Sequence, residues 1–346
     1  MSARWRRWLL IGGGLALALA VAAAVAAVDV FRFLHSPMEG VPDDGAIYRI
    51  EPGTPVAGIA AELAERGLIE RPSYLRLTAR LSGAARRLQA GEYAIEPGMT
   101  PYRLLERFES GRVKQHSLTI IEGWTFHQVV SALRDAQALT HEVSDQPPER
   151  IMESLGHGGE HPEGRFFPDT YNFPRGTTDR ALLQRAYDRM ARVLERAWAE
   201  RQAGLPLDGP YDALILASII ERETGVPEER RRIGGVFVER LEQGMLLQTD
   251  PTVIYGLGGD YTGDITYEHL RRDTPYNTYT RAGLPPTPIA MPSEASIEAA
   301  VDPERRGELY FVSTGEGEHV FSKTLEEHER AVDKYQLDRG RGGSEE

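Results

Sequence analysis

The chain contains no cysteine among its 346 residues. This absence excludes disulfide bridges, thiolate metal sites, catalysis by a thiol and a lipid anchor on an N-terminal cysteine. Basic side chains are also in the minority, since 40 Lys and Arg stand against 52 Asp and Glu, which gives a net charge of −12 at pH 7. Nucleic acids are bound through clustered Lys and Arg. We therefore expect no nucleic acid among the partners of this chain.

Charged residues are absent from residues 8–28, an apolar run rich in Leu, Ala and Val. About 20 such residues span the hydrocarbon core of a bilayer. Residues 1–7 carry Arg4, Arg6 and Arg7, and a basic flank tends to stay in the cytoplasm. A cleaved signal peptide is the alternative, but its apolar core has only about 7–15 residues. The sequence therefore predicts a single-pass anchor in the cell inner membrane, with the rest of the chain on the periplasmic or cell-surface side.

Residues 48–53 and 93–98 repeat one short pattern, Tyr-x-Ile-Glu-Pro-Gly. Apolar residues at helical spacing follow each copy, which predicts a strand, a Pro-Gly turn and an amphipathic helix, twice over. This small α+β module, residues 46–117, resembles the LysM type of glycan-binding module. Sugar binding and a purely structural spacer both remain open. The Pro-containing residues 29–45 are predicted to form a stalk before the module.

The remainder of the chain predicts a helix-rich α+β domain over residues 118–336, so the fold class expected for the whole chain is α+β. Long segments with helical periodicity lie at residues 181–198, 212–224 and 227–243. Further on, a Gly-containing turn separates two short apolar segments, 309–312 and 319–321, which predicts a hairpin. The charged, Gly-rich residues 337–346 are predicted to be a disordered tail.

The helix expected over residues 212–224 is apolar until it ends in two glutamates. Gly225 and Pro227 stop it, so Glu221 and Glu223 lie in its last turn and face different sides. The residues three, four and seven before Glu223 are all apolar, so Glu223 is expected to be the more desolvated. Burial and the negative end of a helix both favour a protonated carboxyl group, which a general acid needs. Glu223 is the first catalytic candidate and Glu221 the second; a pair of solvated helix-end charges is the alternative.

A polar stretch and a series of tyrosines follow this helix. Aromatic faces that carry hydroxyl and amide groups suit sugar rings, which combine apolar C–H faces with directional hydroxyls. Packing of part of these tyrosines in the core is the alternative. The candidate substrate-binding residues in this region are Gln248, Asp250, Thr252, Tyr255, Tyr276, Asn277 and Tyr279.

Five ordered segments together resemble the YceG-like family, also called MltG, the endolytic murein transglycosylases. They are Glu-Gly-Arg-Phe-Phe-Pro-Asp-Thr-Tyr at 163–171, Ala-Ser-Ile-Ile-Glu-Arg-Glu-Thr at 217–224, Leu-Gln-Thr-Asp-Pro-Thr-Val-Ile-Tyr at 247–255, Tyr-Asn-Thr-Tyr at 276–279 and Gly-Leu-Pro-Pro at 283–286. Two positions depart from the family pattern: Thr287 interrupts a usual Pro-Gly-Pro, and Met291 replaces a small or polar residue.

The resemblance implies a membrane-anchored lyase without a cofactor or metal. Such an enzyme cuts nascent peptidoglycan strands internally between N-acetylmuramic acid and N-acetylglucosamine, leaves 1,6-anhydro-N-acetylmuramic acid ends, terminates strand elongation and works beside peptidoglycan synthases. Related enzymes carry a catalytic glutamate directly followed by Ser or Thr, which fits Glu223 and Thr224. The resemblance also adds Asp169 to the candidate substrate-binding residues.

Three other functions remain as alternatives. A glycan-binding scaffold for cell-wall synthases would need no catalytic Glu223. A muramidase would hydrolyse the same bond and usually needs two carboxylates. A metal hydrolase would use His157 and His161, but the glycines between them disfavour the helix that would bring them together.

Overall fold

The computed structural model describes residues 3–315 and 317–337. It confirms a mixed α+β chain, which divides into two compact units: Met1–His116 with Phe173–Arg175, and Ser117–Asn172 with Gly176–Glu346. Most of the tail predicted over residues 337–346, and the first two residues of the predicted basic tail, lie outside the described residues.

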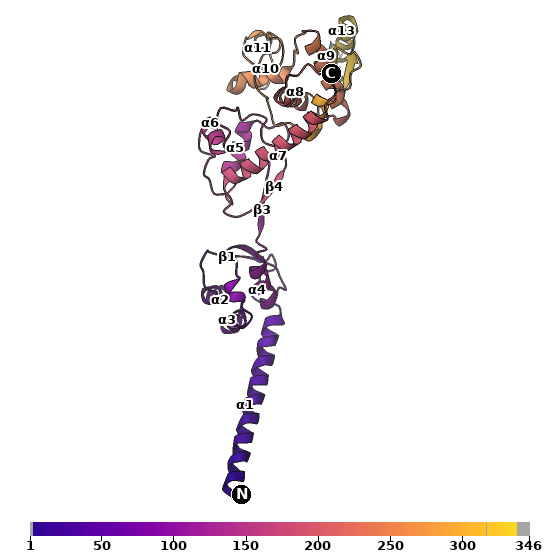
Figure 1. Ribbon diagram of the computed structural model, residues 1–346. Coiled ribbons are helices and arrows are strands. Elements are labelled where there is room, and N and C mark those ends of the chain that lie inside the picture. Colours follow the sequence, from indigo (N-terminus) through magenta and orange to yellow (C-terminus); the bar gives the residue numbers. More distant parts are fainter. Residues whose placement is uncertain (1–2, 316, 338–346) are drawn as a thin grey trace, which may run out of the picture. The chain divides into compact units, whose positions relative to one another are not determined.

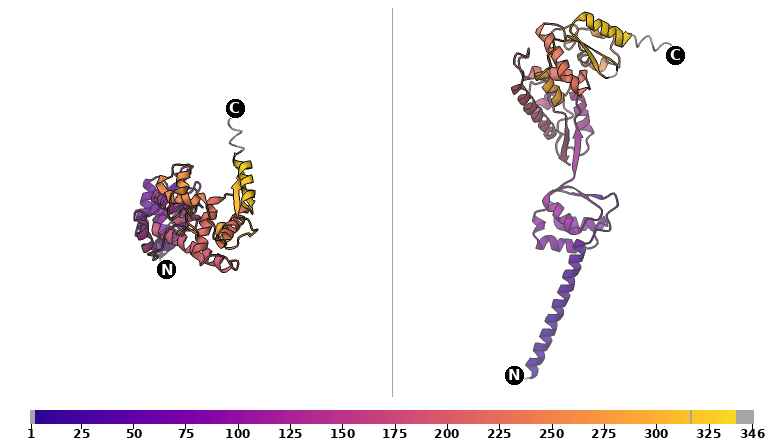
Figure 2. Two further views of the ribbon diagram at one scale, coloured as in Figure 1. Left: turned by 90° about the horizontal axis from the view of Figure 1, so that it is seen from above. Right: turned by 90° about the vertical axis from the view of Figure 1, so that its right-hand side faces the viewer.

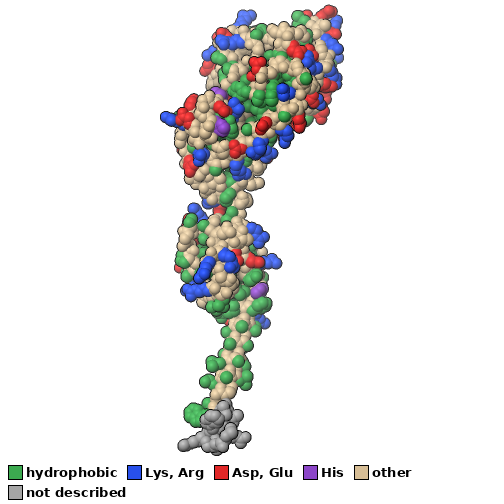
Figure 3. All heavy atoms as spheres, in the orientation of Figure 1, with side chains coloured by type: hydrophobic (Ala, Val, Ile, Leu, Met, Phe, Trp, Pro, Cys, Tyr) green, Lys and Arg blue, Asp and Glu red, His purple; other side chains and the backbone are tan. Residues whose placement is uncertain are grey.

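The apolar N-terminal run forms a single helix, α1, Ala3–His35. Its segment Ile11–His35 is long and apolar enough to cross a membrane, by length and composition. Side chains such as Leu15, Leu19 and Val25 are exposed, and Figure 3 shows apolar side chains along the helix. An exposed apolar surface of this extent is typical of a helix in contact with lipid rather than water.

The stalk predicted over residues 29–45 differs from the structure in its first part, because α1 continues to His35. Asp29 accepts hydrogen bonds from Arg71 and from Tyr74 (2.8 Å), and the Met38 amide donates to the Met99 carbonyl (2.9 Å). These contacts fix the segment to the first unit, so that it is not a free linker.

The rest of the first unit consists of two strands and three longer helices. Its elements are β1 Ala46–Ile50, α2 Val56–Glu65, α3 Pro72–Leu81, the helical turn η1 Ala84–Arg86, β2 Gly91–Ile95 and α4 Pro101–Ser110. The repeated pattern therefore forms strand, turn and helix in both copies, as predicted. The two strands pair antiparallel with Tyr48 opposite Tyr93, and both rings are buried. Gly53 and Gly98 hold the two turns at φ 82° and 76°, a conformation that favours glycine.

The second unit is mainly helical. Strands β3 Gln115–Thr119 and β4 Thr170–Pro174 have residues in both units. The elements that lie wholly in the second unit begin with α5 Phe126–Asp135, α6 Pro148–Ser154, α7 Asp179–Ala199, α8 Pro210–Glu223, η2 Pro227–Glu229 and α9 Arg230–Glu242. They are followed by α10 Asp250–Leu257, η3 Gly258–Asp260, α11 Tyr267–Arg271, α12 Glu294–Val301, β5 Tyr310–Ser313, β6 His319–Ser322, α13 Leu325–Val332 and η4 Asp333–Leu337. β3 pairs with β4, and β5 pairs antiparallel with β6. The three predicted helices and the predicted hairpin are confirmed, and α13 lies beside that hairpin (Figures 1 and 2).

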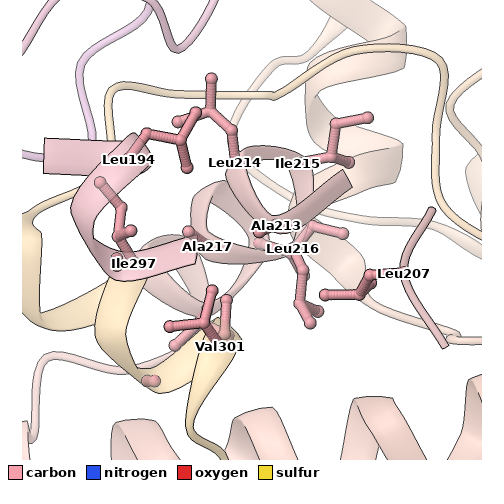
Figure 4. Close-up of a cluster of buried hydrophobic side chains, with 14 of the residues drawn as sticks. Leu194, Leu207, Ala213, Leu214, Ile215, Leu216, Ala217, Ile297 and Val301 are labelled. Atoms are coloured by element: carbon pink, nitrogen blue, oxygen red, sulfur yellow. The ribbon is translucent and has the colours of Figure 1, made fainter. Parts of the chain in front are cut away.

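Helix α8 is the centre of this unit. Every residue from 213 to 220 is buried, and the helix packs against α7, α9 and α12. Figure 4 shows its side chains among Leu194 of α7 and Ile297 and Val301 of α12. A side chain at Gly234 of α9 would lie 2.6 Å from the Ala299 carbonyl oxygen, so glycine permits this close packing. The core thus holds the carboxyl end of α8 in a fixed place.

Candidate active site

Helix α8 ends at Glu223. The preceding turns are apolar and buried, and Thr224 leaves the helical conformation (φ −137°, ψ 138°) before Gly225 and Pro227. The stop signals in the sequence therefore place the last helical residue, a carboxylic acid, at the edge of the core. This agrees with the predicted helix end.

Glu223 lies in the wall of a cavity of about 490 Å³. Four of the predicted site residues meet there: Glu223, Gln248, Asp250 and Tyr279. The other lining residues are Arg240, Leu247, Tyr310, Phe311, Val312, Ser313, His319, Leu325, His328 and Val332. One side of the cavity is thus built by the carboxyl end of α8 and the segment before α10, and the other by the β5–β6 hairpin and α13.

The surroundings of Glu223 favour its protonated form. Burial raises the pKa of this carboxyl group to about 7, and the negative charge of Asp250 acts in the same direction. A hydrogen bond from the Thr249 hydroxyl and the positive charge of Arg240 oppose this rise. A carboxyl group of this pKa is present in both forms near neutral pH, so it can donate a proton and then accept one.

The backbone before α10 is shaped to present Thr249. Gln248 has φ 51°, an uncommon conformation for a residue other than glycine, and its side chain is exposed in the cavity. The Gln248 amide donates to the Thr278 carbonyl (3.1 Å), and the Thr249 amide donates to the Thr278 hydroxyl (3.1 Å). These bonds maintain a turn that directs the Thr249 hydroxyl at Glu223. Backbone strain at such a position is typical of functional sites.

Glu221, the second catalytic candidate, has a different environment. Its Oε2 accepts hydrogen bonds from the Ser293 amide (3.0 Å), the Ser293 hydroxyl (2.5 Å) and the Ser296 hydroxyl (2.7 Å). Arg230 lies 4.0 Å from its other oxygen. Ser293 is the N-cap of α12, so this carboxylate sits at the positive end of a helix. Glu221 thus joins α8 to α12 through three hydrogen bonds.

Asp250 and Tyr279 form a pair in the cavity. The Tyr279 hydroxyl donates to Oδ1 of Asp250 (2.6 Å). Burial and this carboxylate both raise the pKa of the Tyr279 hydroxyl, so it remains a donor at neutral pH. The pair offers an aromatic face beside an acceptor, the combination that a sugar ring requires.

Arg240 was not predicted as a site residue. Its Nε donates to the Leu309 carbonyl (2.7 Å) and its Nη1 to the Leu247 carbonyl (2.7 Å), so it ties α9 to both sides of the cavity. Burial lowers the pKa of its guanidinium group. A signal was present in the sequence, since Arg240 falls four and three residues after Val236 and Phe237 and so continues a buried apolar stripe.

His319 was also missed. Its Nδ1 lies 2.7 Å from Oε2 of Glu229, and its amide donates to Oε1 of the same carboxylate (2.7 Å). The Thr224 hydroxyl, next to Glu223, reaches Glu229 at 3.3 Å. These contacts dock the hairpin beside the end of α8. No local pattern marks His319, because its partner lies 90 residues earlier in the chain.

Two predicted site residues are buried away from the cavity. The Asn277 side chain donates to the carbonyls of Leu270 (3.1 Å) and Arg272 (2.8 Å) and accepts from the Tyr279 amide (2.8 Å). The Thr252 hydroxyl donates to the Thr249 carbonyl (2.7 Å). Both therefore support the backbone that carries Thr249 and Tyr279, and neither lines the cavity.

Three further candidates lie elsewhere in the same unit. Tyr276 stacks edge-on against Tyr255 (4.8 Å) and its hydroxyl lies 2.9 Å from that of Thr287. Asp169 pairs with Arg189 of α7 and accepts the Thr170 amide (2.7 Å). The structure does not bring Tyr255, Tyr276 or Asp169 to the cavity around Glu223.

Tyr255 instead faces a second cavity of about 500 Å³ around Glu163. The Tyr255 hydroxyl donates to Oε2 of Glu163 (2.9 Å), and the Phe126 amide at the start of α5 donates to Oε1 (2.9 Å). Burial raises the pKa of the Glu163 carboxyl group to about 7. Glu163 thus links α5 to α10, and we assign it a structural role.

The two histidines of the metal-hydrolase alternative each have other contacts. His157 stacks on Tyr187 (3.8 Å between ring centres), while the Glu163 amide lies 3.3 Å from Nδ1 of His161. Within residues 3–315 and 317–337, no group of three His, Asp or Glu side chains has an arrangement that holds a metal ion.

Comparison with known proteins identifies related chains. The model of the YceG-like family matches residues 48–334. The chain is 30% identical over 321 residues to the endolytic murein transglycosylase of Bacillus subtilis (strain 168), and the match covers 88% of each protein. It is 26% identical over 320 residues to that of Streptococcus pneumoniae (strain D39), covering 82% of this chain and 57% of the relative. The crystal structure of a yceG-like protein from Listeria monocytogenes is similar, with a TM-score of 0.54 and 28% identity over 84% of this chain and 99% of that one.

Proposed function

This chain belongs to the YceG-like family, and we propose that it is an endolytic murein transglycosylase, the activity after which its relatives are named. Its substrate is the glycan strand of peptidoglycan. The observation that carries the proposal is the position of Glu223, whose pKa burial raises to about 7, in the wall of a cavity large enough to hold sugar residues.

In the proposed reaction Glu223 acts twice. As the acid, it protonates the glycosidic oxygen between N-acetylmuramic acid and N-acetylglucosamine, and the bond from that oxygen to the anomeric carbon breaks. As the carboxylate, it takes the proton from the 6-hydroxyl of the same muramoyl residue while O6 bonds to the anomeric carbon. Glu223 ends as it began, protonated, and the product has a 1,6-anhydro end. Water contributes no atom, so one carboxyl group suffices.

The other cavity residues are proposed to bind and orient the sugar. Thr249 fixes the rotamer of Glu223, while Tyr279 offers its ring and Asp250 its second oxygen to the substrate. Gln248 presents a side chain that makes no hydrogen bond to the described residues. The negative charge of Asp250 is suited to stabilise the positive charge that develops on the anomeric carbon.

The domain arrangement is proposed as follows. Residues 1–7 lie in the cytoplasm, 8–28 cross the inner membrane and 118–336 form the catalytic domain outside the cytoplasm. Residues 46–117 form a module that resembles the glycan-binding LysM type. The helical, membrane-length character of α1 and the strand-helix-helix-strand order of the module support this arrangement. Cleavage of nascent strands beside peptidoglycan synthases would terminate their elongation.

The test is digestion of purified glycan strands by the full-length chain in detergent. Glu223→Gln keeps the shape of the side chain but cannot exchange the proton, so we expect cleavage to fall on the order of 10²–10⁴-fold. Glycan binding by the same variant should persist. If Glu223→Gln cleaved at the normal rate, Glu223 would not be the catalytic group. If the wild-type protein bound strands without cleaving them, it would be a glycan-binding scaffold rather than an enzyme.

A further inference from the structure

Residues 71–87 differ in charge from the rest of this chain. They carry Arg71, Arg76, Arg80, Arg86 and Arg87 and contain no Asp or Glu, whereas the whole chain has a net charge of −12. They comprise α3 and the helical turn that follows it. A local excess of five positive charges on an acidic protein requires an explanation.

Helix α3 exposes a face that is both basic and apolar. Leu75 and Ala79 are buried against the first unit, while Arg76, Arg80, Leu77 and Leu81 are exposed. Leu77 and Leu81 lie four residues apart, on the same side of the helix, with exposed fractions of 47% and 80%, so together they form one exposed apolar patch.

Three arginines of this segment have no partner. Arg71 pairs with Asp29 and Arg87 with Glu109, but the side chains of Arg76, Arg80 and Arg86 form no ion pair or hydrogen bond with any described residue. Their charges are therefore available to an external anion.

Contacts with α1 place α3 where the apolar helix meets the unit. Tyr74 donates to Asp29 (2.8 Å), and its ring packs edge-on against Phe33 (5.7 Å between centres). Both partners lie in the last two turns of α1. Figures 1 and 2 show α3 lying crosswise to α1 at the end of the unit from which α1 leaves. A helix crosswise to a membrane-spanning helix, at its point of exit, runs along the membrane surface.

We propose that α3 lies on the membrane that α1 crosses, with Arg76, Arg80 and Arg86 bound to anionic phospholipid headgroups and Leu77 and Leu81 inserted between them. The inference rests on the anchoring role of α1 in the proposed function. Basic amphipathic helices bind membranes through this combination of charge and buried apolar area. The contacts to Asp29 and Phe33 keep the face at the bilayer, which favours lipid over a diffusing partner. The contact would fix the first unit relative to the membrane surface.

The absence of cysteine permits a clean test with the full-length chain. Leu81→Cys is labelled with an environment-sensitive fluorophore and reconstituted into nanodiscs of phosphatidylcholine, alone or with about one-third phosphatidylglycerol, a lipid mixture chosen for its surface charge. We expect a blue shift and protection from acrylamide quenching in anionic discs. Both effects should decline in about 1 M salt, where the Debye length is only about 3 Å.

Matched variants separate the arginines from other effects. Arg76→Gln, Arg80→Gln and Arg86→Gln together should abolish the lipid-dependent shift. The control variant combines Arg49→Gln, Arg66→Gln and Arg112→Gln. It loses three positive charges from the same unit and should keep the lipid-dependent shift. A label at Ser110→Cys, on the exposed end of α4, should not respond.

The outcomes distinguish the two proposals. If the chain enters the discs but its label at residue 81 is equally exposed to quencher with neutral and anionic lipid, the inference is wrong and the anchor stands. The inference also fails if the variant without Arg76, Arg80 and Arg86 retains the shift. If the chain does not enter the discs, the anchor itself is wrong and the inference falls with it.

Discussion

The hydroxyl group of Thr249 donates its hydrogen bond to the carboxyl group of Glu223. The two residues come from the start of α10 and the end of α8, and the Thr278 contacts hold the first in place. This bond stabilises the charged form of Glu223, whereas burial opposes it. The balance between them sets the pH at which the group can act as an acid.

Thr249→Val removes the donor while keeping the shape of the side chain. Because the bond lowers the pKa of Glu223, its loss should raise that pKa and move the alkaline limb of the kcat/KM profile to higher pH. Thr249→Ser, which keeps the hydroxyl, should behave as the normal chain. An alkaline limb that stays in place or moves to lower pH in Thr249→Val would contradict this role.

The pH profile of the normal chain should itself report Glu223. Only the protonated group donates to the glycosidic oxygen, so kcat/KM should fall about tenfold per pH unit above a pH of about 7. Glu163→Gln is the control, because Glu163 is the other described carboxyl group whose pKa is raised to about 7. If the limb disappeared in Glu163→Gln, it would belong to that residue instead.

Glu163 should make stability depend on pH. The pKa of Glu163 in the folded chain, about 7, exceeds its ordinary value of 4.5. The contribution of its protonated carboxyl group to the free energy of unfolding is therefore fully present below pH 4.5 and is lost as pH rises through 7. At about 1.4 kcal/mol per pKa unit, the full effect is about 3 kcal/mol. Because the pKa of Glu223 is raised to the same value, chemical unfolding at pH 5 and pH 8 should show that Glu163→Gln reduces the loss of stability between these pH values by about 3 kcal/mol and leaves the part due to Glu223. If Glu163→Gln lost as much stability between pH 5 and pH 8 as the wild-type protein, ionisation of Glu163 would not destabilise the fold.

Glu221 and Glu223 should respond oppositely to substitution. Glu221→Ala leaves Ser293 and Ser296 without their acceptor at the start of α12, so we expect a loss of about 3 kcal/mol in the free energy of unfolding. Glu223→Gln should leave that free energy unchanged or raised, while cleavage collapses. Thermal unfolding and activity, measured on the same preparations, check both. If Glu223→Gln lost stability while its folded fraction kept normal activity, Glu223 would be the structural residue and Glu221 the catalytic one.

The repeat and the apolar stripe could be predicted because both are local. Tyr48 and Tyr93 head two copies of one pattern, and they pair with each other across the antiparallel strands. The run of apolar residues before Glu223, with Gly225 and Pro227 after it, specified both the burial of α8 and its end. Periodicity and stop signals of this kind lie within a single element.

The far wall of the cavity could not be predicted, because it is assembled from distant segments. His319 reaches Glu229 across 90 residues, and Arg240 binds Leu309 across 69. Polar residues near the site were also ambiguous. Asn277 and Thr252 have the side chains of sugar-binding residues, yet their bonds go to the backbone. Sequence cannot tell an amide that binds a carbonyl group from one that binds a substrate.

The central claim is that the nucleophile is the 6-hydroxyl of the substrate and that Glu223 moves its proton. It is tested most directly by mass spectrometry of glycan fragments produced by the full-length chain in water enriched in heavy oxygen, with Glu223→Gln as the background. We predict new muramoyl ends that are anhydro and carry no heavy oxygen, formed only by the normal chain. Ends that carry heavy oxygen would contradict the account, since they would make the enzyme a hydrolase with a second essential carboxylate.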